Sequence, residues 1–561
     1  MPQETKQRLN ARLNLITAIT YLLGFLICGR LFILTVVKHD YYLAKSDIQE
    51  RLAILQITRR GEIYLKNQKE NLYPVAINKG WPMVYAEPNR IESNRKELAE
   101  KLSEILNMDK GTILEKIVDR DDPYELIKRK LNEEEQEEIE RKIKDKGIKI
   151  KTEESLRYYP AGNLACHVIG FLGYKGDERV GQYGIEEYYN SDLSGKTGLY
   201  KELDNEETSG SNITLSIDSN IQLFVEERLK KAVENYDAEG GTVVVMNPKS
   251  GKIMAMANYP DFDLNQYAKI ENFDVFVNSA VSLVFEPGSV FKPITMAIGL
   301  DQDKVTPSTS YYDKGYVKIG SHTIYNADQK VYGEQTMTQV LEKSLNTGIV
   351  FVADLLEQET VINYLNKFGF GKETGIDLPG EARGNINNLM EGREINFATA
   401  SFGQGISVTP VQLTRAFSAI ANAGMLPAVS VVESIEKGDK IQDVVDQKSQ
   451  RVISEDTANR LTAMLVNVTE EGTGSQAKIP GYLIATKTGT AQIPLEHARG
   501  YSEDEVIHTI VGFGPAYDAR FVILVKLDRP HGVKFAARSV APVFKDIAEQ
   551  LINYFEISPQ I

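Results

Sequence analysis

The chain has 561 residues, of which 42% are hydrophobic and 9% aromatic, a composition typical of a folded protein too long for a single core. Its 78 acidic and 64 basic residues give a net charge of −14, which argues against a nucleic-acid-binding protein. Two cysteines exclude a disulfide framework, and six scattered histidines without a His-x-x-x-His pair do not predict a metal site. We expect no cofactor.

An apolar run at residues 13–37 is broken only by Asn14 and Arg30. As a helix it would be ~37 Å long at ~1.5 Å per residue, enough to cross a hydrocarbon layer of ~30 Å. Arg30 lies near its far end, where a long side chain can reach the lipid headgroups. A cleaved signal peptide is the alternative, but the small residues that precede a cleavage site are not convincingly placed. We therefore expect a transmembrane helix over residues 13–37.

The charges before this run predict the orientation of the protein. Lys6, Arg8 and Arg12 precede the run, and the cytoplasmic flanks of membrane helices carry such an excess of basic residues. We expect residues 1–12 to be a cytoplasmic tail. The chain would then be a single-pass protein of the cytoplasmic (inner) membrane, with its amino terminus inside and the remainder outside.

The amino-acid composition and periodicity of residues 38–210 change along the segment. A short polar helix is predicted for residues 38–50, and residues 51–78 alternate like strands. Residues 91–154 are rich in Lys and Glu, with apolar positions at helical spacing, and predict amphipathic helices with solvated faces. From Leu156 the chain becomes rich in glycine and tyrosine, which indicates tight loops packed against aromatic side chains.

A second domain is expected over residues 211–561, since strand patterns resume at Asn212. Residues 240–260 predict a β-hairpin, because two apolar runs flank a turn that contains Pro248 and Gly251. From there to the end, helical and strand patterns alternate without a long disordered stretch.

Ser-x-x-Lys, a spacing that can join a nucleophile to its base, occurs four times. The copy Ser289/Lys292 follows a Glu-Pro-Gly break and begins a helical pattern, where Pro293 is tolerated in the first turn. Residues three apart share a helix face, so Lys292 would lie beside Ser289, and a desolvated neutral lysine can take the serine's proton. The other copies, which we assign to surface or loop positions, are Ser93/Lys96, Ser434/Lys437 and Ser475/Lys478.

Two downstream motifs distinguish Ser289 from the other copies. The chain's single Ser-x-Asn is formed by Ser344 and Asn346. A Lys-Thr-Gly motif begins at Lys487, after a strand-like run; an earlier copy at residues 196–198 lies outside the expected second domain. The three motifs follow one another in the order Ser-x-x-Lys, Ser-x-Asn, Lys-Thr-Gly.

With these motifs in this order, the sequence resembles the serine acyl-transferases that include penicillin-binding proteins and class A β-lactamases. Further blocks resemble the class B penicillin-binding proteins over nearly the whole chain, most like their division-specific (septal) members. These blocks are RRGEIYLKN, RYYPAGNLACHVIG, GQYGIEEYYNSDLSGKTG, FEPGSVFKPIT, FGFGKETGIDLPGE and FGQGISVTPVQLTRAFSAIANAG. Three positions depart from the family pattern: Leu65, where Asp is usual; Leu345, where Ser is common; and Thr486, where Gly is frequent and Thr would narrow the site edge.

The resemblance implies an α+β multidomain fold. A transmembrane helix would be followed by an elongated mixed α/β pedestal, related to the dimerisation domain, over residues 38–210. Residues 211–561 would form the penicillin-binding transpeptidase domain, an antiparallel sheet flanked by helices as in serine β-lactamases. The implied activity is peptidoglycan D,D-transpeptidation during septal wall synthesis, with stem peptides as substrates and β-lactams as inhibitors. A membrane glycan polymerase and division-complex proteins would be partners.

The resemblance also implies roles for individual residues. Ser289 would be the nucleophile and Lys292 its base, while Ser344 would relay a proton to the leaving amine and Lys487 would set the local potential. Asn346 would hydrogen-bond Lys292 and the substrate backbone. The residues implied to bind the substrate are Thr488, Gly489 and Thr490, with the two threonines on the terminal carboxylate and the N–H groups of Ser289 and Thr490 forming the oxyanion hole.

Other functions remain open on the sequence alone. A D,D-carboxypeptidase or β-lactamase-type hydrolase would need fast deacylation by water and would leave the pedestal unexplained. A β-lactam signalling receptor would be expected to carry an intracellular effector, and only about a dozen residues precede the span. An inactive scaffold would be expected to lose one of the three motifs, and all are intact. An elongation-specific transpeptidase is the alternative to a septal one, and the acceptor residue of the stem peptide is not identified.

Overall fold

The structure is a computed structural model that describes residues 3–38, 59–118, 124–176, 178–195, 209–444, 449–495 and 500–560. Its described residues group into two compact units. The first contains the described residues up to Arg60 together with Asn78–Arg157, and the second contains Gly61–Ile77, Tyr158–Gly195 and everything described from residue 209 onward. The polar helix predicted for residues 38–50, apart from Lys38, and the earlier Lys-Thr-Gly copy lie outside the described residues.

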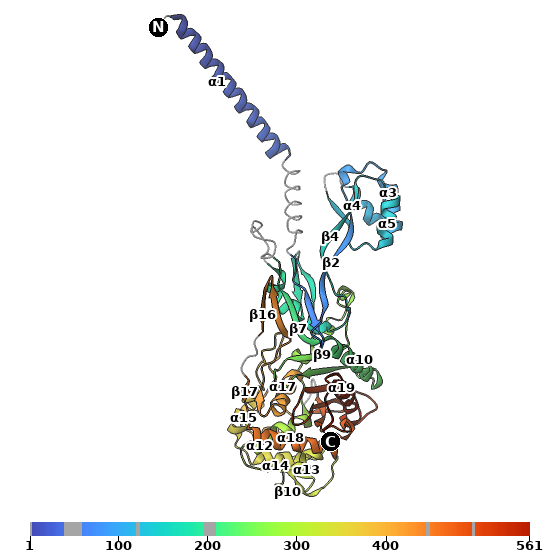
Figure 1. Ribbon diagram of the computed structural model, residues 1–561, viewed down its shortest axis with the longest axis vertical. Helices are drawn as coiled ribbons and strands as arrows, with labels where there is room; N and C mark the ends of the chain where they lie inside the picture. The colour runs from blue at the N-terminus through green and yellow to red at the C-terminus, as the bar shows by residue number, and fades with distance from the viewer. Residues whose placement is uncertain are drawn as a thin grey trace. The chain divides into compact units, whose positions relative to one another are not determined.

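The apolar run near the amino terminus forms helix α1 (Gln3–Phe32), which continues as the π-helical turn η1 (Ile33–Val37) (Figure 1). The segment Asn14–Val37 has a mean hydropathy of 2.0 and none of it is buried against other parts of the protein. Two of its hydroxyls are satisfied within the helix, since Thr20 Oγ1 donates to Ile16 O (2.9 Å) and Thr35 Oγ1 to Leu31 O (2.8 Å). In hydrocarbon such groups have no water partner, so α1 and η1 have the length, composition and internal pairing of a membrane anchor.

The first unit also contains a small α/β body. Helices α3 (Arg95–Leu106), α4 (Lys110–Val118) and α5 (Glu133–Lys142) pack with β3 (Glu125–Lys128), with the later part of β2 (Leu72–Ala86) and with β4 (Ile148–Tyr158). Their apolar faces meet in one core that includes Leu102, Ile113 and Ile139, which confirms the predicted amphipathic helices. The surface assignment of Ser93/Lys96 is also confirmed, because both are exposed at the start of α3.

In the second unit, a mixed sheet joins strands from both sides of residue 210. Strand β1 (Ile63–Lys66) pairs in parallel with β7 (Asn212–Asp218) and antiparallel with the start of β2. The sheet continues from β7 to β15 (Val432–Lys437) and β16 (Lys440–Asp443). Leu65, the residue that departs from the family pattern, is fully buried in the core beneath this sheet, where an apolar side chain is favoured.

A second sheet of this unit has five antiparallel strands in the order β18-β19-β20-β8-β9. Their bounds are Ala485–Pro494 for β18, Tyr501–Gly514 for β19, Phe521–Asp528 for β20, Gly240–Met246 for β8 and Ile253–Tyr259 for β9. Strands β8 and β9 confirm the hairpin predicted for residues 240–260. In its turn Gly251 has φ 76° and a Cβ there would lie 1.7 Å from Ala428 O, so only glycine fits.

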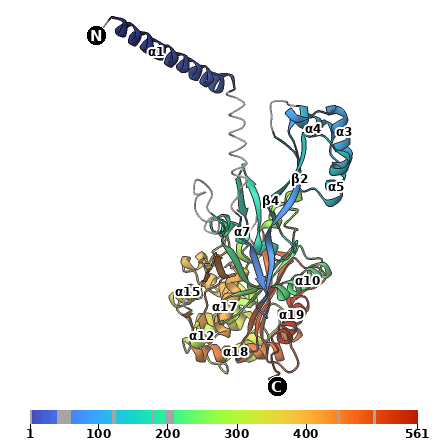
Figure 2. The ribbon, with the colours of Figure 1, turned by 45° about the horizontal axis from the view of Figure 1, so that its top comes forward.

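Alternate residues of this sheet enter two different cores, because successive side chains of a strand point to opposite faces. Ile523 and Val525 of β20 pack with α10 (Ser219–Asn235) and α19 (Val540–Tyr554). Val522 and Leu524 pack on the other face with α12 (Lys292–Asp301), α17 (Pro410–Ala421) and α18 (Glu455–Glu470). Figure 2 shows the two helix groups on opposite sides of the unit. The antiparallel sheet flanked by helices confirms the predicted fold class.

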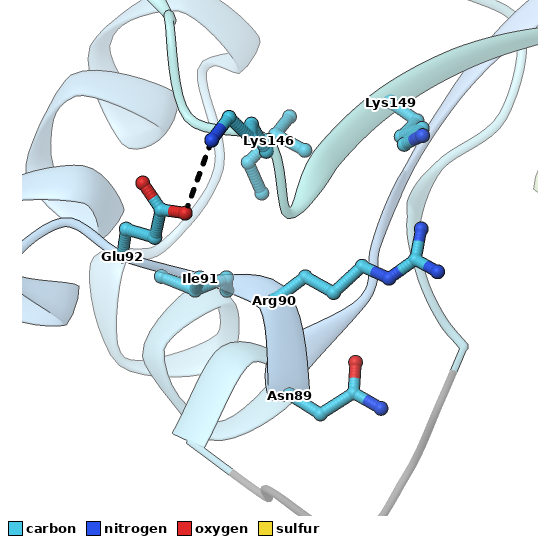
Figure 3. Close-up of a pocket in the computed structure, with 7 residues that line it drawn as sticks. Asn89, Arg90, Ile91, Glu92, Lys146 and Lys149 are labelled. Carbon is cyan, nitrogen blue, oxygen red and sulfur yellow. Dashed lines mark hydrogen bonds and ion pairs between the residues drawn. The ribbon is translucent and has the colours of Figure 1, made fainter.

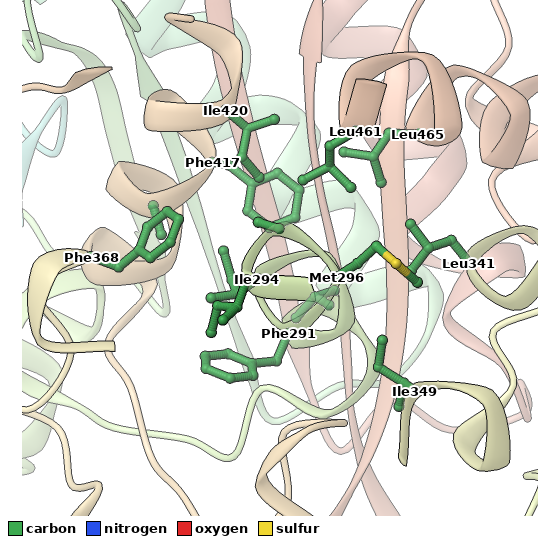
Figure 4. Close-up of a cluster of buried hydrophobic side chains, with 14 of the residues drawn as sticks. Phe291, Ile294, Met296, Leu341, Ile349, Phe368, Phe417, Ile420, Leu461 and Leu465 are labelled. Carbon is green, nitrogen blue, oxygen red and sulfur yellow. The ribbon is translucent and has the colours of Figure 1, made fainter. Parts of the chain in front are cut away.

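The core around α12 holds the site in place. Buried hydrophobic side chains from five helices meet there (Figure 4). They are Phe291, Ile294 and Met296 around α12, Leu341 of α13 (Met337–Glu342), Ile349 of α14 (Asn346–Asp354), Phe417 and Ile420 of α17, and Leu461 and Leu465 of α18. Close-packed cores resist displacement, so the ends of these helices keep fixed positions.

Candidate active site

The predicted nucleophile lies at the start of α12, as expected. Ser289 is in the 3₁₀ turn η5 (Gly288–Phe291), which runs directly into α12 at Lys292. Ser289 is half-buried, whereas the side chain of Lys292 is fully buried. A 3₁₀ turn followed by an α-helix keeps residues three apart on one face, so the pair Ser289/Lys292 has the arrangement that the spacing predicts.

Two glycines hold the turn that carries Ser289. Gly288 has φ 58° and donates its N–H to Gly403 O (3.0 Å). Gly403 has φ 81°, and a Cβ there would lie 2.3 Å from Gly288 O and 2.6 Å from Gly288 N. No side chain fits at such distances, so the contact depends on glycine at position 403.

Ser344 is the point on which both predicted lysines converge. Lys292 Nζ lies 2.6 Å from Ser344 O and 3.3 Å from Ser344 Oγ, and Lys487 Nζ lies 2.9 Å from Ser344 Oγ. Ser344 itself has φ 59°, a left-handed conformation that costs a non-glycine residue of order 1–3 kcal/mol. This conformation in the turn between α13 and α14 directs both the carbonyl and the hydroxyl of Ser344 at the lysines.

Burial disfavours the charged form of these two lysines. Both side chains are fully buried, and in the part of the chain that the structure describes neither has a carboxylate partner. Burial lowers the pKa of Lys487 from 10.5 to about 7. Burial, followed by the positive charge of Lys487, holds the pKa of Lys292 well below its usual value. A lysine kept neutral in this way can accept a proton from a serine.

The Lys-Thr-Gly motif lies on β18, which is an edge strand of the five-stranded sheet. In the described chain no strand pairs with its outer edge, so alternate backbone N–H and C=O groups remain available to a bound extended peptide. Lys487 Nζ also donates to Thr488 O (3.0 Å), and Thr490 Oγ1 accepts from Ala536 N (3.1 Å). The Thr490 hydroxyl keeps its own proton for donation to a ligand.

Gly489 allows β18 to approach the turn that carries Ser289. A Cβ at Gly489 would lie 3.0 Å from Val290 N and 3.1 Å from Pro287 O. We expect Gly489→Ala to push β18 away from η5 by a few tenths of an ångström and to slow acylation of Ser289 by a penicillin about 10- to 100-fold, because reacting groups tolerate little misplacement. Stopped-flow acylation alongside thermal melting measures this effect. An unchanged rate in a folded variant would show that the contact does not control the site.

Two sequence expectations need correction. Asn346 Nδ2 donates to Tyr325 O (2.9 Å), and among the described residues the expected bond between Asn346 and Lys292 is not formed. Thr486 does not narrow the site edge, because its side chain is fully buried and its Oγ1 bonds Thr469 Oγ1 of α18 (2.9 Å). Thr486 lies next to Lys487 on a strand, and neighbouring side chains there point to opposite faces.

The structure adds supporting contacts that no motif indicated. Tyr501 Oη, at the start of β19, donates to Glu286 Oε2 (3.1 Å), three residues before Ser289. At the start of α14, Thr347 Oγ1 donates to Asp313 Oδ1 (2.7 Å), and Asn326 Nδ2 donates to Asp313 Oδ2 (3.0 Å). These partners are far apart in sequence and belong to no periodic pattern, so only the fold reveals them.

A separate hollow of about 610 Å³ lies in the first unit and contains none of the predicted site residues. Figure 3 shows its lining, in which Lys146 forms an ion pair with Glu92 (3.3 Å). The remaining lining residues include Arg90 and Lys149, so the hollow is polar and basic but has no serine, threonine or cysteine to act as a nucleophile.

Comparison with known proteins places these motifs in a family. Residues 241–549 match the penicillin-binding protein transpeptidase domain, and residues 56–214 match the penicillin-binding protein dimerisation domain. The chain is 32% identical over 524 residues to stage V sporulation protein D of Bacillus subtilis (strain 168), covering 89% of this chain and 79% of that protein. It is 30% identical over 574 residues to the probable peptidoglycan D,D-transpeptidase PenA of Neisseria meningitidis, covering 98% and 94%. Among solved structures, penicillin-binding protein 3 of Mycobacterium tuberculosis in complex with aztreonam superposes with a TM-score of 0.71 at 25% identity, covering 90% of this chain and 98% of that one.

Proposed function

Since this chain belongs to the class B penicillin-binding proteins and is a serine-type peptidoglycan D,D-transpeptidase, we propose that its reaction runs through an acyl-enzyme on Ser289. The observation that supports this site most is that two buried lysines, neither with a carboxylate partner among the described residues, both contact Ser344. Leu345 packs in the same core as Val290 and Phe291 of the turn that carries Ser289. The test is cross-linking of pentapeptide-bearing glycan strands by the full-length protein in detergent. Release of D-alanine without formation of cross-links would instead indicate a carboxypeptidase.

In the first half-reaction, the neutral amine of Lys292 takes the proton of the Ser289 hydroxyl. Ser289 Oγ then attacks the carbonyl carbon between the two terminal D-alanines of a donor stem peptide. The peptide C–N bond breaks, and the leaving amine receives its proton through the hydroxyl of Ser344, which Lys487 contacts at 2.9 Å. D-alanine departs and the donor peptide remains as an ester on Ser289.

In the second half-reaction, an amine of a neighbouring stem peptide attacks the ester carbonyl. It loses a proton to the same groups, a new amide bond forms, and Ser289 Oγ recovers its hydrogen. We assign the oxyanion hole to the N–H groups of Ser289 and Thr490, and the terminal carboxylate of the donor to the hydroxyls of Thr488 and Thr490. Loss of one oxyanion donor typically costs about 3 kcal/mol of barrier stabilisation.

The two lysines predict a specific pH dependence. Acylation requires neutral Lys292, so its rate should fall on the acid side as Lys292 gains a proton. The positive charge of Lys487 helps to lower the pKa of Lys292. Replacing Lys487 by Met removes that charge, so the pKa of Lys292 should rise and the acid limb of the rate profile should move to higher pH. Acylation rates of the wild type and Lys487→Met between pH 5 and 9 measure this shift. A limb that stays in place or moves to lower pH would contradict the assignment of Lys292 as the base.

We further propose that the enzyme acts in septal wall synthesis, which the resemblance of its motif blocks to division-specific members supports. Depletion of the protein in its own organism tests this role. Filamentous cells would support the septal assignment, whereas rounded cells would indicate side-wall elongation. Normal growth with a defect confined to spores would instead favour a role like that named for the Bacillus subtilis relative.

For the membrane arrangement, we propose that residues 1–12 are cytoplasmic and that α1 is a single-pass anchor in the cytoplasmic membrane. The basic residues before the span support this orientation. We propose that residues 38–210 form the pedestal and residues 211–561 the transpeptidase domain. A membrane glycan polymerase and division-complex proteins would be the partners of the span and pedestal. Labelling of single cysteines placed before and after α1 in intact cells tests the orientation.

A further inference from the structure

A small β-hairpin beside the site presents an exposed aromatic face. Strands β11 (Tyr316–Ile319) and β12 (His322–Tyr325) pair antiparallel, and Gly320 and Ser321 join them. The inner face of the hairpin packs on the main core through Val317, Ile319 and Ile324. Its outer face consists of Tyr316, Lys318, Thr323 and Tyr325, all of them exposed.

The two tyrosines of this outer face form a pair. Tyr316 and Tyr325 are direct cross-strand partners with ring centroids 6.2 Å apart, and they are 45% and 55% exposed. The two-residue turn and the packed inner face hold both backbones, so the rings lose little conformational freedom when a ligand binds. Large aromatic side chains that a fold presents to solvent side by side are typical of binding surfaces.

Hydrogen bonds connect the segment after this pair to the Ser-x-Asn motif. Tyr325 O accepts from Asn346 Nδ2 (2.9 Å), and the next residue, Asn326, is buried. Asn326 Oδ1 accepts from the N–H of Thr347 (3.3 Å), the residue after Asn346. The hairpin therefore keeps a fixed position relative to Asn346, and a ligand on its outer face would lie next to a substrate held at the Ser-x-Asn motif.

We propose that the outer face of the β11–β12 hairpin binds the glycan strand that carries the stem peptide, an inference that rests on the proposed transpeptidase function. A pyranose ring has an apolar face of C–H groups that stacks on the electron-rich face of an aromatic ring. Its hydroxyls and N-acetyl groups would find hydrogen-bond partners in Thr323 and Lys318, on the same face. The stem peptide is covalently attached to a sugar, so a glycan must lie near any stem that enters the site.

The chemistry of this face favours sugar over peptide. An extended peptide is best bound by an unpaired strand edge, which β18 supplies at the Lys-Thr-Gly motif. The hairpin instead offers two ring faces and hydrogen-bonding side chains on an exposed surface. This division would let the enzyme prefer stems on glycan strands over free stem peptides.

The test uses the full-length protein with Tyr316→Ala and Tyr325→Ala combined. The backbone carbonyl of Tyr325, and with it the bond from Asn346, is retained in this variant. Three reactions are measured: acylation by benzylpenicillin, reaction with free pentapeptide, and cross-linking of uncross-linked glycan strands. Loss of two ring contacts should raise KM for the glycan strands about tenfold, with kcat and the two glycan-free reactions unchanged. Glycan strands stripped of their stems should inhibit cross-linking by the wild type and not by the variant.

Matched variants complete the test. The pair Tyr316→Phe and Tyr325→Phe keeps the rings and should behave like the wild type, as should Tyr517→Ala, which removes a tyrosine that is 57% exposed elsewhere. An unchanged KM for glycan strands would overturn the proposal. An equal loss with free pentapeptide would assign the face to the peptide, and an equal loss of penicillin acylation would show that the tyrosines act only through Asn346. Wild-type protein that is acylated but never cross-links would reject the proposed function itself.

Discussion

Ser289→Ala in the full-length protein should abolish covalent labelling by a fluorescent penicillin. The change removes a single oxygen from a half-buried side chain in η5, so the turn, which Gly288 and Gly403 hold through their backbones, should keep its shape. Without Oγ no ester can form, and the loss should be complete rather than partial. Denaturing gel fluorescence after incubation with excess penicillin measures labelling, and thermal melting confirms that the variant is folded.

The chain supplies its own controls for this experiment. Ser93→Ala and Ser475→Ala alter other copies of the same four-residue spacing. Both variants should label like the wild type, since these serines and the lysines three residues after them are exposed. Stoichiometric labelling of a folded Ser289→Ala variant would mean that another residue is the nucleophile.

Lys292→Met should reduce the acylation rate constant by about 10²- to 10⁴-fold, the range that a general base contributes. Methionine has a similar length and no charge, so it fills the same buried space. It cannot accept the proton of Ser289, and it leaves Ser344 O without the donor that now lies 2.6 Å away. Stopped-flow measurement of acylation against penicillin concentration separates this loss of rate from a loss of initial binding.

The same variant has an opposite expected effect on stability. The pKa of Lys292 is lower in the folded state than in the unfolded state, so the unfolded state binds more protons at neutral pH and the lysine opposes folding. Removing it should therefore leave the melting temperature unchanged or raised, apart from the lost bond to Ser344. Lys96→Met, at an exposed copy of the spacing, is the matched control for the melting temperature.

For the acylation experiment, a rate constant of Lys292→Met within tenfold of the wild type would place the general base elsewhere.

Much of this site could be predicted from the sequence because its parts are local. The spacing of Ser289 and Lys292 is a helix property, and the hairpin of β8 and β9 follows from two apolar runs and a glycine turn. The family resemblance assigns Lys292, Ser344 and Lys487 to one site, but the contacts of both lysines with Ser344 come from the structure alone. Neither the left-handed backbone of Ser344 nor the donation from Asn346 to Tyr325 O could be predicted, because both depend on segments that approach only in the folded chain.

The fold also has parts that local sequence patterns predict and parts that they do not. Helices α3 and α5 were predictable from amphipathic spacing, and their Asn94 and Asn132 caps are ordinary helix starts. The parallel pairing of β1 with β7 was not, since these strands lie about 150 residues apart and no local pattern selects a partner at that distance. Leu65 and Thr486 depart from the family pattern in the sequence, and the structure shows that both side chains are buried in the protein core.

The burial of Lys292 and Lys487 has a consequence for any search for sturdier forms of this enzyme. Both groups oppose folding at neutral pH, since folding moves an amine from water into an environment that disfavours its charge. A selection that rewards heat resistance alone would therefore accumulate replacements at these two positions. The most heat-stable variants would then lack the proposed base Lys292 or its neighbour Lys487, and we expect them to be inactive. Selection for stability in this protein has to be coupled to penicillin labelling at every round.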